Sequence, residues 1–575
     1  MSVPAEIRRR YLMKLIEVWP RRTTSQHFRV WTERYQDRPF IIMPHRQMTY
    51  RQTWDRAWQL AKSLLAYGIR RREHVALLMS NDPDFVALWI ALSLVGAVAV
   101  PLNTQLLESE LAYILKQSDS RILIFHESVG HINHARTIAS IWDKWEHTSQ
   151  HSALEQVIII PTQDDFADMA VPLTTWEAFV QSGKNIGDHI VQARWDQSHY
   201  PDEVAAIIYT SGTTGTPKGV MLTHDNFLRC AYSTCLSRAF EDGQRIFTPL
   251  PLYHVFALEE GVLALSFVGG TLIMQSQFHP AQALELMSQY QVNDALLVPS
   301  MLISLLNQKA VDQYDWSHLY SLMCAAAPAP VPIWQKSVDV FGLSELCTGY
   351  GGTEVTASTT HSEVTDSIEQ VVSTVGRIKP GGVSGLWEYG GANVEYKVIN
   401  PKTGQDLPPG STGELTVRGN IVSRGYYRKP DETAQSFDKD GWFRSGDLGR
   451  IDEHGYIKFL GRSKDLFKVS GENVSPTEVE DVLTQHPAVK QAYVVGVPDP
   501  ITGEIGAAFV ELNSNRSATR KELRDWCQSE LARFKIPRYI FFVQSNEWPL
   551  TGSGKIQKFQ LREKARKLIE ARVHG

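Results

Sequence analysis

The sequence has few cysteines, no long apolar run and no excess of basic residues. Its 575 residues include five cysteines, and none of them is spaced as a zinc ligand. We therefore expect buried free thiols in a reducing compartment, which favours a cytoplasmic location. No apolar stretch approaches the roughly 18 residues of a membrane helix, so no membrane span is expected. The formal net charge of −5 gives no reason to expect nucleic acid as a partner.

No signal peptide is expected at the amino terminus. Arg8-Arg9-Arg10 precedes an apolar stretch that is too short and is interrupted by Lys14. We expect a solvated amphipathic segment there. The length of the chain exceeds what one hydrophobic core supports, so two or more domains are expected.

Short apolar runs alternate with helical patterns in the first 200 residues. Strands are predicted at 74–80, 97–102 and 121–125, and a buried helix over 84–96. Residues 128–155 and 163–200 are polar and predict only loops and surface helices. This alternation is typical of an α/β domain with largely parallel, buried strands.

A glycine- and hydroxyl-rich loop follows the predicted strand at 204–208. Its glycines let backbone N–H groups approach an anion, its hydroxyls add donors, and its lysine adds a positive charge. The loop therefore predicts polyphosphate binding. The candidate residues are Ser211, Gly212, Thr213, Thr214, Gly215, Thr216 and Lys218.

The loop is not a Walker motif, because Pro217 precedes its lysine and Gly219-Val220 follow it. It resembles the phosphate-binding signature of the adenylate-forming enzymes, which include acyl-CoA synthetases, 4-coumarate-CoA ligases, luciferases and adenylation domains. The resemblance extends over roughly residues 30–570, with five motifs in the family's order.

Three further segments of the large domain resemble family motifs. Pro249–His254 is similar to a stretch that lines the acyl pocket, which implies a role for His254 in the reaction. Ala325–Pro328 and Gly349–Glu354 are similar to the adenine- and metal-binding segments. The small residues let a flat base approach, Tyr350 offers a stacking face, and a carboxylate suits Mg²⁺. The residues implied are Ala326, Gly349, Tyr350 and Thr353 for the nucleotide, and Glu354 with Thr213 for catalysis and Mg²⁺.

The carboxyl-terminal motifs complete the resemblance. Asp447 matches the ribose-binding carboxylate, which can accept hydrogen bonds from both hydroxyls. Arg462 matches a second ribose contact and Lys464 the family's hinge, with Lys468 beyond it. Gly471 falls where pantetheine passes the backbone, and Lys555 matches the catalytic lysine.

The resemblance implies an α/β fold with two domains. We expect a large amino-terminal domain of βα-layered subdomains (1–462) and a small, mobile α+β domain (463–575). Within the small domain, helices are predicted from 476 and around 520–531, and strands at 493–497 and 506–512. The Gly-rich stretch 376–398 predicts a surface hairpin.

The activity implied is ATP-dependent ligation of a carboxylic acid to coenzyme A through an acyl adenylate, with Mg²⁺. Three alternatives stay open: transfer of the acyl group to a carrier protein, luciferase-like oxygen chemistry, and a non-catalytic nucleotide-binding scaffold. Retention of Glu354 and Lys555 argues against the scaffold. Fatty, aryl and carnitine-like acids all remain open, as does the oligomeric state, a homodimer included.

Overall fold

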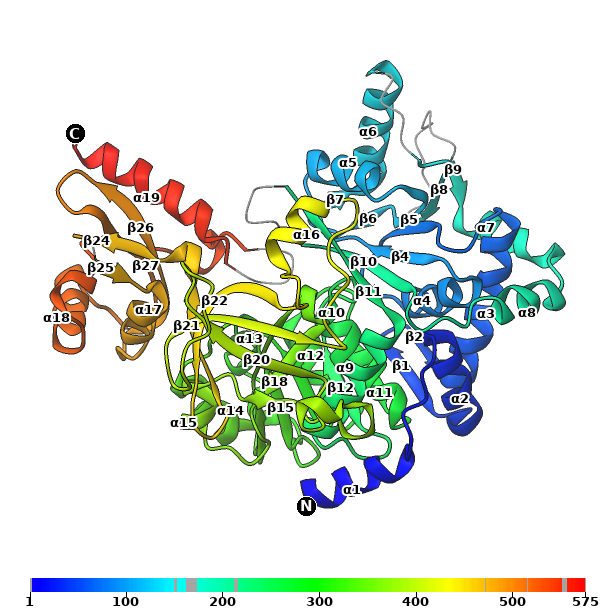
Figure 1. The fold of residues 1–575 in the computed structure, drawn as a ribbon, viewed down its shortest axis with the longest axis horizontal. Helices are drawn as coiled ribbons and strands as arrows, with labels where there is room; N and C mark the ends of the chain where they lie inside the picture. The colour runs from blue at the N-terminus through cyan, green and yellow to red at the C-terminus, as the bar shows by residue number, and fades with distance from the viewer. Residues whose placement is uncertain are drawn as a thin grey trace.

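A computed structural model describes residues 3–148, 153–161, 173–210, 216–470, 472–513, 516–550 and 556–573. Two seven-stranded sheets and their helices form the larger part of the molecule (Figure 1). The carboxyl-terminal elements form a smaller group at one end, beside β21 and β22. No helix within the described ranges combines the length and apolar character needed to cross a bilayer.

The first sheet is parallel except for its edge strand β2, and its order is β16-β15-β14-β12-β13-β1-β2. Its strands are β1 (Pro39–Met43), β2 (Arg46–Thr49), β12 (Arg245–Thr248), β13 (Thr271–Met274), β14 (Asp294–Leu297), β15 (Ser321–Cys324) and β16 (Glu345–Cys347).

The second sheet is parallel except for its edge strand β11, and its order is β11-β10-β4-β3-β5-β8-β9. Its strands are β3 (His74–Leu78), β4 (Val98–Pro101), β5 (Ser120–His126), β8 (Gln156–Ile160), β9 (Leu173–Thr175), β10 (Val204–Thr210) and β11 (Lys218–Thr223).

Both faces of each sheet are buried, as the apolar strand sequences require. One core contains side chains from both sheets together with α2, α3, α4 and α9. The opposite face of the first sheet packs on α12–α14, and that of the second on α5 and α6. The helices concerned are α2 (Thr24–Tyr35), α3 (Tyr50–Ala66), α4 (Pro83–Val95), α5 (Glu108–Gln117), α6 (His134–Thr148), α9 (His224–Ser237), α12 (Pro280–Gln289), α13 (Pro299–Leu306) and α14 (Val331–Phe341).

Two smaller antiparallel sheets follow in the chain. They are β17-β18-β19 and β20-β21-β22-β23. Their strands are β17 (Gly349–Gly352), β18 (Ala357–His361), β19 (Arg377–Ile378), β20 (Val394–Ile399), β21 (Gly413–Gly419), β22 (Phe443–Ile451) and β23 (Ile457–Arg462). Further helices of this part are α7 (Trp176–Ser182), α8 (Asp188–Asp196), α15 (Ile368–Ser373) and α16 (Pro430–Ser436).

The carboxyl-terminal group has its own sheet and its own cores. It contains β24 (Phe467–Val469), β25 (Glu472–Val474), β26 (Val489–Asp499), β27 (Gly503–Leu512), β28 (Tyr539–Phe542), α17 (Pro476–Thr484), α18 (Arg520–Glu530) and α19 (Lys558–Val573). The predicted α/β class with a large amino-terminal and a smaller carboxyl-terminal part is confirmed.

Most of the predicted elements are present. The strands at 74–80, 97–102, 121–125 and 204–208 correspond to β3, β4, β5 and β10, and the buried helix to α4. The two predicted carboxyl-terminal strands are longer in the structure, because their outer residues are only partly buried and carry no apolar run. Strand β9 was missed, since its Leu-Thr-Thr sequence is short and half-exposed.

The predicted amphipathic amino-terminal segment is present as a helix, but it is solvated on one side only. Helix α1 (Ala5–Leu15) buries Leu12 and the guanidinium of Arg8, which pairs with buried Glu345 of β16 at the edge of the first sheet. Arg9 also donates to the Leu236 carbonyl at 2.9 Å and pairs with Glu363 at 2.8 Å. The pattern was misleading because the partners of these arginines lie more than 200 residues away.

The stretch 376–398 is a surface hairpin only at its tip. Antiparallel bridges join Pro380 and Leu386 to Ala392, and the Trp387 side chain is 94 % exposed. The base of the hairpin is instead buried, at Lys379 and Asn393. All five cysteines are free and buried, as predicted.

Candidate functional site

Three of the predicted segments follow the carboxyl ends of strands in the first sheet. His254 comes after β12, Ala326 after β15 and Gly349 after β16. These strands run parallel, so their following loops meet at one edge of the sheet. Ligands of open α/β sheets bind at this edge. The architecture therefore brings together segments that are almost 100 residues apart.

The hairpin of β17 and β18 depends on its glycines. A Cβ at Gly349 would lie 2.5 Å from the Thr360 carbonyl oxygen, and one at Gly351 would lie 2.0 Å from that of Ala357. The neighbouring strand therefore leaves no room for a side chain at either glycine, whether or not a ligand is bound. Ala326 has φ +72°, a left-handed conformation that is uncommon for alanine.

Tyr350, Asp447 and Arg462 form one contact group. The Tyr350 hydroxyl donates to Asp447 Oδ2 at 2.6 Å, and Arg462 Nε lies 3.2 Å from Asp447 Oδ1. Asp447 and Arg462 are paired residues of β22 and β23. Burial and the charge of Asp447 raise the pKa of Tyr350 well above its usual value, which keeps its hydroxyl a donor. The predicted base-stacking and ribose residues are thus in direct contact.

The Tyr350 ring also has aromatic neighbours. Its centroid lies 5.8 Å from that of Phe459 and 6.5 Å from that of Tyr396. These contacts hold the ring in one orientation. Tyr350 is only partly exposed to solvent.

Lys218 and Glu354 meet at the side chain of Tyr426. Lys218, the first residue of β11, places its Nζ 4.9 Å from the Tyr426 ring centroid. The Tyr426 hydroxyl donates to Glu354 Oε1 at 3.0 Å. Thr216 is exposed just before β11, and Thr353 is buried beside Glu354. The predicted phosphate lysine and the predicted metal carboxylate are therefore neighbours.

His254 begins an irregular helical run. Its Nδ1 accepts the N–H of Phe256 at 3.3 Å, as the cap of α10 (Val255–Ala257). The run continues as a π-helical segment, Leu258–Leu263, and then as α11 (Ala264–Phe267). π-Helical segments are frequent at functional sites. His254 itself is half-buried.

The predicted hinge lies between two sheets. Arg462 ends β23, the 3₁₀ turn Ser463–Asp465 follows, and β24 begins the carboxyl-terminal sheet. Partial burial and the Arg462 charge lower the pKa of Lys464. The Lys468 side chain is exposed, while its backbone N–H donates to Glu504 Oε2 at 2.9 Å.

Several predicted site residues lie outside the described ranges. They are Ser211, Gly212, Thr213, Thr214, Gly215, Gly471 and Lys555. Their roles stay predictions.

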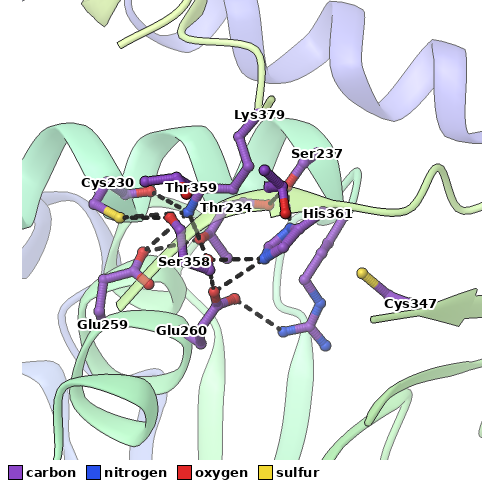
Figure 2. Close-up of polar contacts among 12 residues, drawn as sticks. Cys230, Thr234, Ser237, Glu259, Glu260, Cys347, Ser358, Thr359, His361 and Lys379 are labelled. Carbon is purple, nitrogen blue, oxygen red and sulfur yellow. Dashed lines mark hydrogen bonds and ion pairs between the residues drawn. The ribbon is translucent and has the colours of Figure 1, made fainter. Parts of the chain in front are cut away.

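A buried polar network includes side chains of β18 (Figure 2). Glu259 and Glu260 come from the π-helical segment, Ser358 and His361 from β18, and Lys379 from the base of the 376–398 hairpin. All five residues are almost fully buried. Sequence reasoning did not identify this network, although two consecutive glutamates inside an apolar helical run were a signal for it.

Hydrogen bonds connect the network from one element to the next. Lys379 Nζ donates to Ser358 Oγ at 3.0 Å and to Thr234 Oγ1 at 2.8 Å, and Thr234 donates to Glu259 at 2.8 Å. Ser358 donates to Glu260. The network therefore ties β18 to helix α9 and to the helical run that begins at His254.

Burial sets the protonation of His361 and the two glutamates. It lowers the pKa of His361 to about 4, so the neutral ring accepts from Ser237 at Nδ1 and donates to Glu260 at Nε2 (3.0 Å). Burial also raises the pKa of Glu259 well above its usual value. Burial opposes ionisation of Glu260 too, but His361, Lys379 and Arg238 outweigh it and lower its pKa. Glu260 is thus the ionised member of the pair.

Ser358→Ala should lower the free energy of unfolding by about 1–3 kcal/mol, because Glu260 and Lys379 each lose a buried hydrogen-bond partner. The midpoint of denaturant-induced unfolding measures this loss. Ser304→Ala is the matched control, since the Ser304 hydroxyl is bonded to Ser300 on an exposed helix face. Equal midpoints for both variants would contradict a stabilising role of the network.

Known proteins resemble this chain over almost its whole length. A family model described as "AMP-binding enzyme" matches residues 28–427, and one described as "AMP-binding enzyme C-terminal domain" matches residues 478–555. The putative acyl-CoA synthetase YngI of Bacillus subtilis is 34 % identical over 92 % of this chain and 94 % of its own.

Two further similarities extend this finding. The mitochondrial medium-chain acyl-CoA ligase ACSF2 of Mus musculus is 30 % identical over 92 % of this chain and 85 % of its own. The crystal structure of the anthranilate CoA ligase AuaEII in complex with anthranoyl-AMP superposes with a TM-score of 0.80. It is 25 % identical and covers 95 % of this chain and 98 % of its own.

Proposed function

Because the chain belongs to the AMP-binding enzyme family, we propose that Tyr350, Asp447 and Arg462 bind the nucleoside of ATP and that Lys218 and Glu354 face its phosphates. The observation that carries this proposal is the direct contact of Tyr350, Asp447 and Arg462, which come from separate strands. The neighbouring contact of Lys218 and Glu354 with Tyr426 supports the phosphate end.

The activity is ATP-dependent ligation of a carboxylic acid to coenzyme A, as in the acyl-CoA synthetases and ligases that the chain resembles. In the first step a carboxylate oxygen attacks the α-phosphorus. The bond between the α-phosphorus and the oxygen that bridges it to the β-phosphate breaks, and pyrophosphate leaves. In the second step the thiol attacks the acyl carbon, and AMP leaves. The chain's part in the first step is orientation and charge stabilisation.

Each residue of the proposed site has a defined task in this scheme. The Asp447 carboxylate accepts hydrogen bonds from the ribose hydroxyls, and Arg462 holds that carboxylate in place. Tyr350 presents a ring face to the base. Lys218, with Ser211–Gly215 and Thr216, stabilises the phosphates. His254 lines the entry for the acyl group, and Lys555 neutralises charge at the reacting carboxylate.

The residues present fit a magnesium ion. Among the described residues, no three His, Cys, Asp or Glu side chains form a metal-binding group. Mg²⁺ does not need one, because it binds through one or two carboxylates together with substrate phosphates and water. Glu354, whose Oε2 accepts no hydrogen bond within the described ranges, would hold it together with Thr213. When bound, the ion would offset phosphate charge.

Asp447→Ala should raise the KM for ATP roughly ten- to a hundred-fold, since hydrogen bonds to a charged acceptor are lost. Initial rates with ATP and with 2′-deoxy-ATP measure the effect. Wild type should discriminate against the deoxynucleotide more strongly than the variant does. Equal discrimination by both proteins would remove Asp447 from the ribose site.

A panel of fatty, aryl and carnitine-like acids tests the activity itself. Pyrophosphate release should depend on one class of acid, and added coenzyme A should yield the thioester. Release without thioester formation would point to a carrier protein as the acceptor, and no release with any acid would favour a nucleotide-binding scaffold.

We place the protein in fatty or related acid metabolism in the cytoplasm. The five buried free cysteines favour a reducing compartment. One relative, ACSF2, is named as a mitochondrial protein. Fractionation of the source cell would therefore decide which compartment holds this protein.

A further inference from the structure

Tyr426 lies between the two charged groups of the phosphate end of the site. Its side chain is buried, its ring faces Lys218 and its hydroxyl donates to Glu354. One side chain thus contacts both the lysine and the carboxylate.

The backbone around Tyr426 is held on both sides. Met221 donates to the Gly425 carbonyl at 3.0 Å and Tyr427 to that of Gly219 at 2.8 Å, which fixes this segment along β11. The Ser423 N–H donates to the Glu354 carbonyl at 2.8 Å. The Tyr426 N–H donates to Thr433 Oγ1 at 3.0 Å. The phenol is therefore attached to a fixed backbone rather than to a free loop.

We propose that Tyr426 is a positioning residue that fixes the Glu354 carboxylate relative to Lys218 for binding of the metal–triphosphate. This inference rests on the proposed metal role of Glu354. By engaging Oε1, the phenol turns the carboxylate so that Oε2 is the oxygen left for a cation. The ring face contributes separately, because a cation held over an aromatic ring is stabilised there.

The neighbouring Tyr427 offers a matched control. Its hydroxyl also donates to a carboxylate, Asp119 Oδ2, at 2.8 Å, but it contacts neither Lys218 nor Glu354. Tyr426→Phe and Tyr427→Phe therefore each remove one phenol hydroxyl and one hydrogen bond to a carboxylate. The first variant keeps the aromatic ring next to Lys218.

Calorimetric titration of the full-length protein with ATP, with Mg²⁺ or with EDTA, tests the inference. In Mg²⁺, Tyr426→Phe should bind ATP about tenfold more weakly than wild type, because the carboxylate loses its orienting donor. In EDTA the two proteins should bind ATP equally. Tyr427→Phe should match wild type in both conditions, and unchanged thermal midpoints would show that all variants are folded.

Glu354→Gln and the double variant separate this inference from the proposed function. If Tyr426 acts through Glu354, the double variant should bind no more weakly than Glu354→Gln alone. The inference would be overturned if the losses of ATP affinity in the two single variants were additive in the double variant. It would also be overturned if Mg²⁺ strengthened ATP binding by Tyr426→Phe as much as by wild type. Either result would leave the metal role of Glu354 in place. If Mg²⁺ strengthened ATP binding by Glu354→Gln as much as by wild type, Glu354 would instead lose its proposed metal role.

Discussion

Lys555→Ala should slow acyl-adenylate formation by about 10²–10³-fold, the usual cost of losing one preorganised charge at a reacting centre. Lys555 lies in a Gly-rich sequence, Thr551–Ile556, at the end of the region that matches the carboxyl-terminal family model. Pyrophosphate exchange at saturating acid and ATP measures the first step.

The second step should be nearly unaffected by this substitution. If the small domain rotates between steps, Lys555 is withdrawn when the thiol attacks, so thioester formation from supplied acyl-AMP should proceed at the wild-type rate. Lys564→Ala is the control, because Lys564 pairs with Glu547 on the surface of the same domain. Equal losses in both half-reactions would remove Lys555 from its assigned role.

Lys464→Pro should separate the two half-reactions in the opposite sense. Lys464 is the central residue of the 3₁₀ turn that joins β23 to the carboxyl-terminal sheet. A domain rotation must be absorbed by a few backbone dihedrals at such a junction. Proline fixes φ near −65°, close to the value of a 3₁₀ turn, and also restricts the preceding residue.

We expect pyrophosphate exchange to persist in Lys464→Pro and coenzyme A thioester formation to fall by orders of magnitude. Lys464→Ala, which removes the same charge but leaves φ free, should retain both steps. Both activities intact in the proline variant would mean that the pivot lies elsewhere or that no rotation is needed.

The local pattern of the sequence was enough for the layered architecture. The apolar run of β10 can be recognised because both faces of a parallel strand are covered by other elements. The buried helix α4 can be recognised because all its faces are covered. The glycine-, hydroxyl- and lysine-rich loop after β10 gives a prediction for a related reason. Consecutive residues of these types supply the backbone and side-chain donors and the positive charge that suit a polyphosphate.

What the sequence could not show are contacts between charged groups far apart in the chain. Arg8 is buried because Glu345 lies against it, and Lys379 is buried because Thr234 and Ser358 accept its hydrogen bonds and the charge of Glu260 lies nearby. An isolated arginine or lysine is ordinarily exposed, so its local pattern predicts a solvated surface. Only the pairing across the fold removes the cost of burying the charge.

The sequence by itself determined the family resemblance and the division into a large and a small part, and it predicted the residues of the proposed site, namely the phosphate loop, Glu354 and Asp447. The tertiary structure alone decided how these groups are held. Tyr350 donates to Asp447, Tyr426 lies between Lys218 and Glu354, and a buried polar network includes side chains of β18. The physical reason is that residue type sets what a side chain can bind. Which oxygen, nitrogen or ring lies within 3 to 5 Å depends on how strands from distant segments pair.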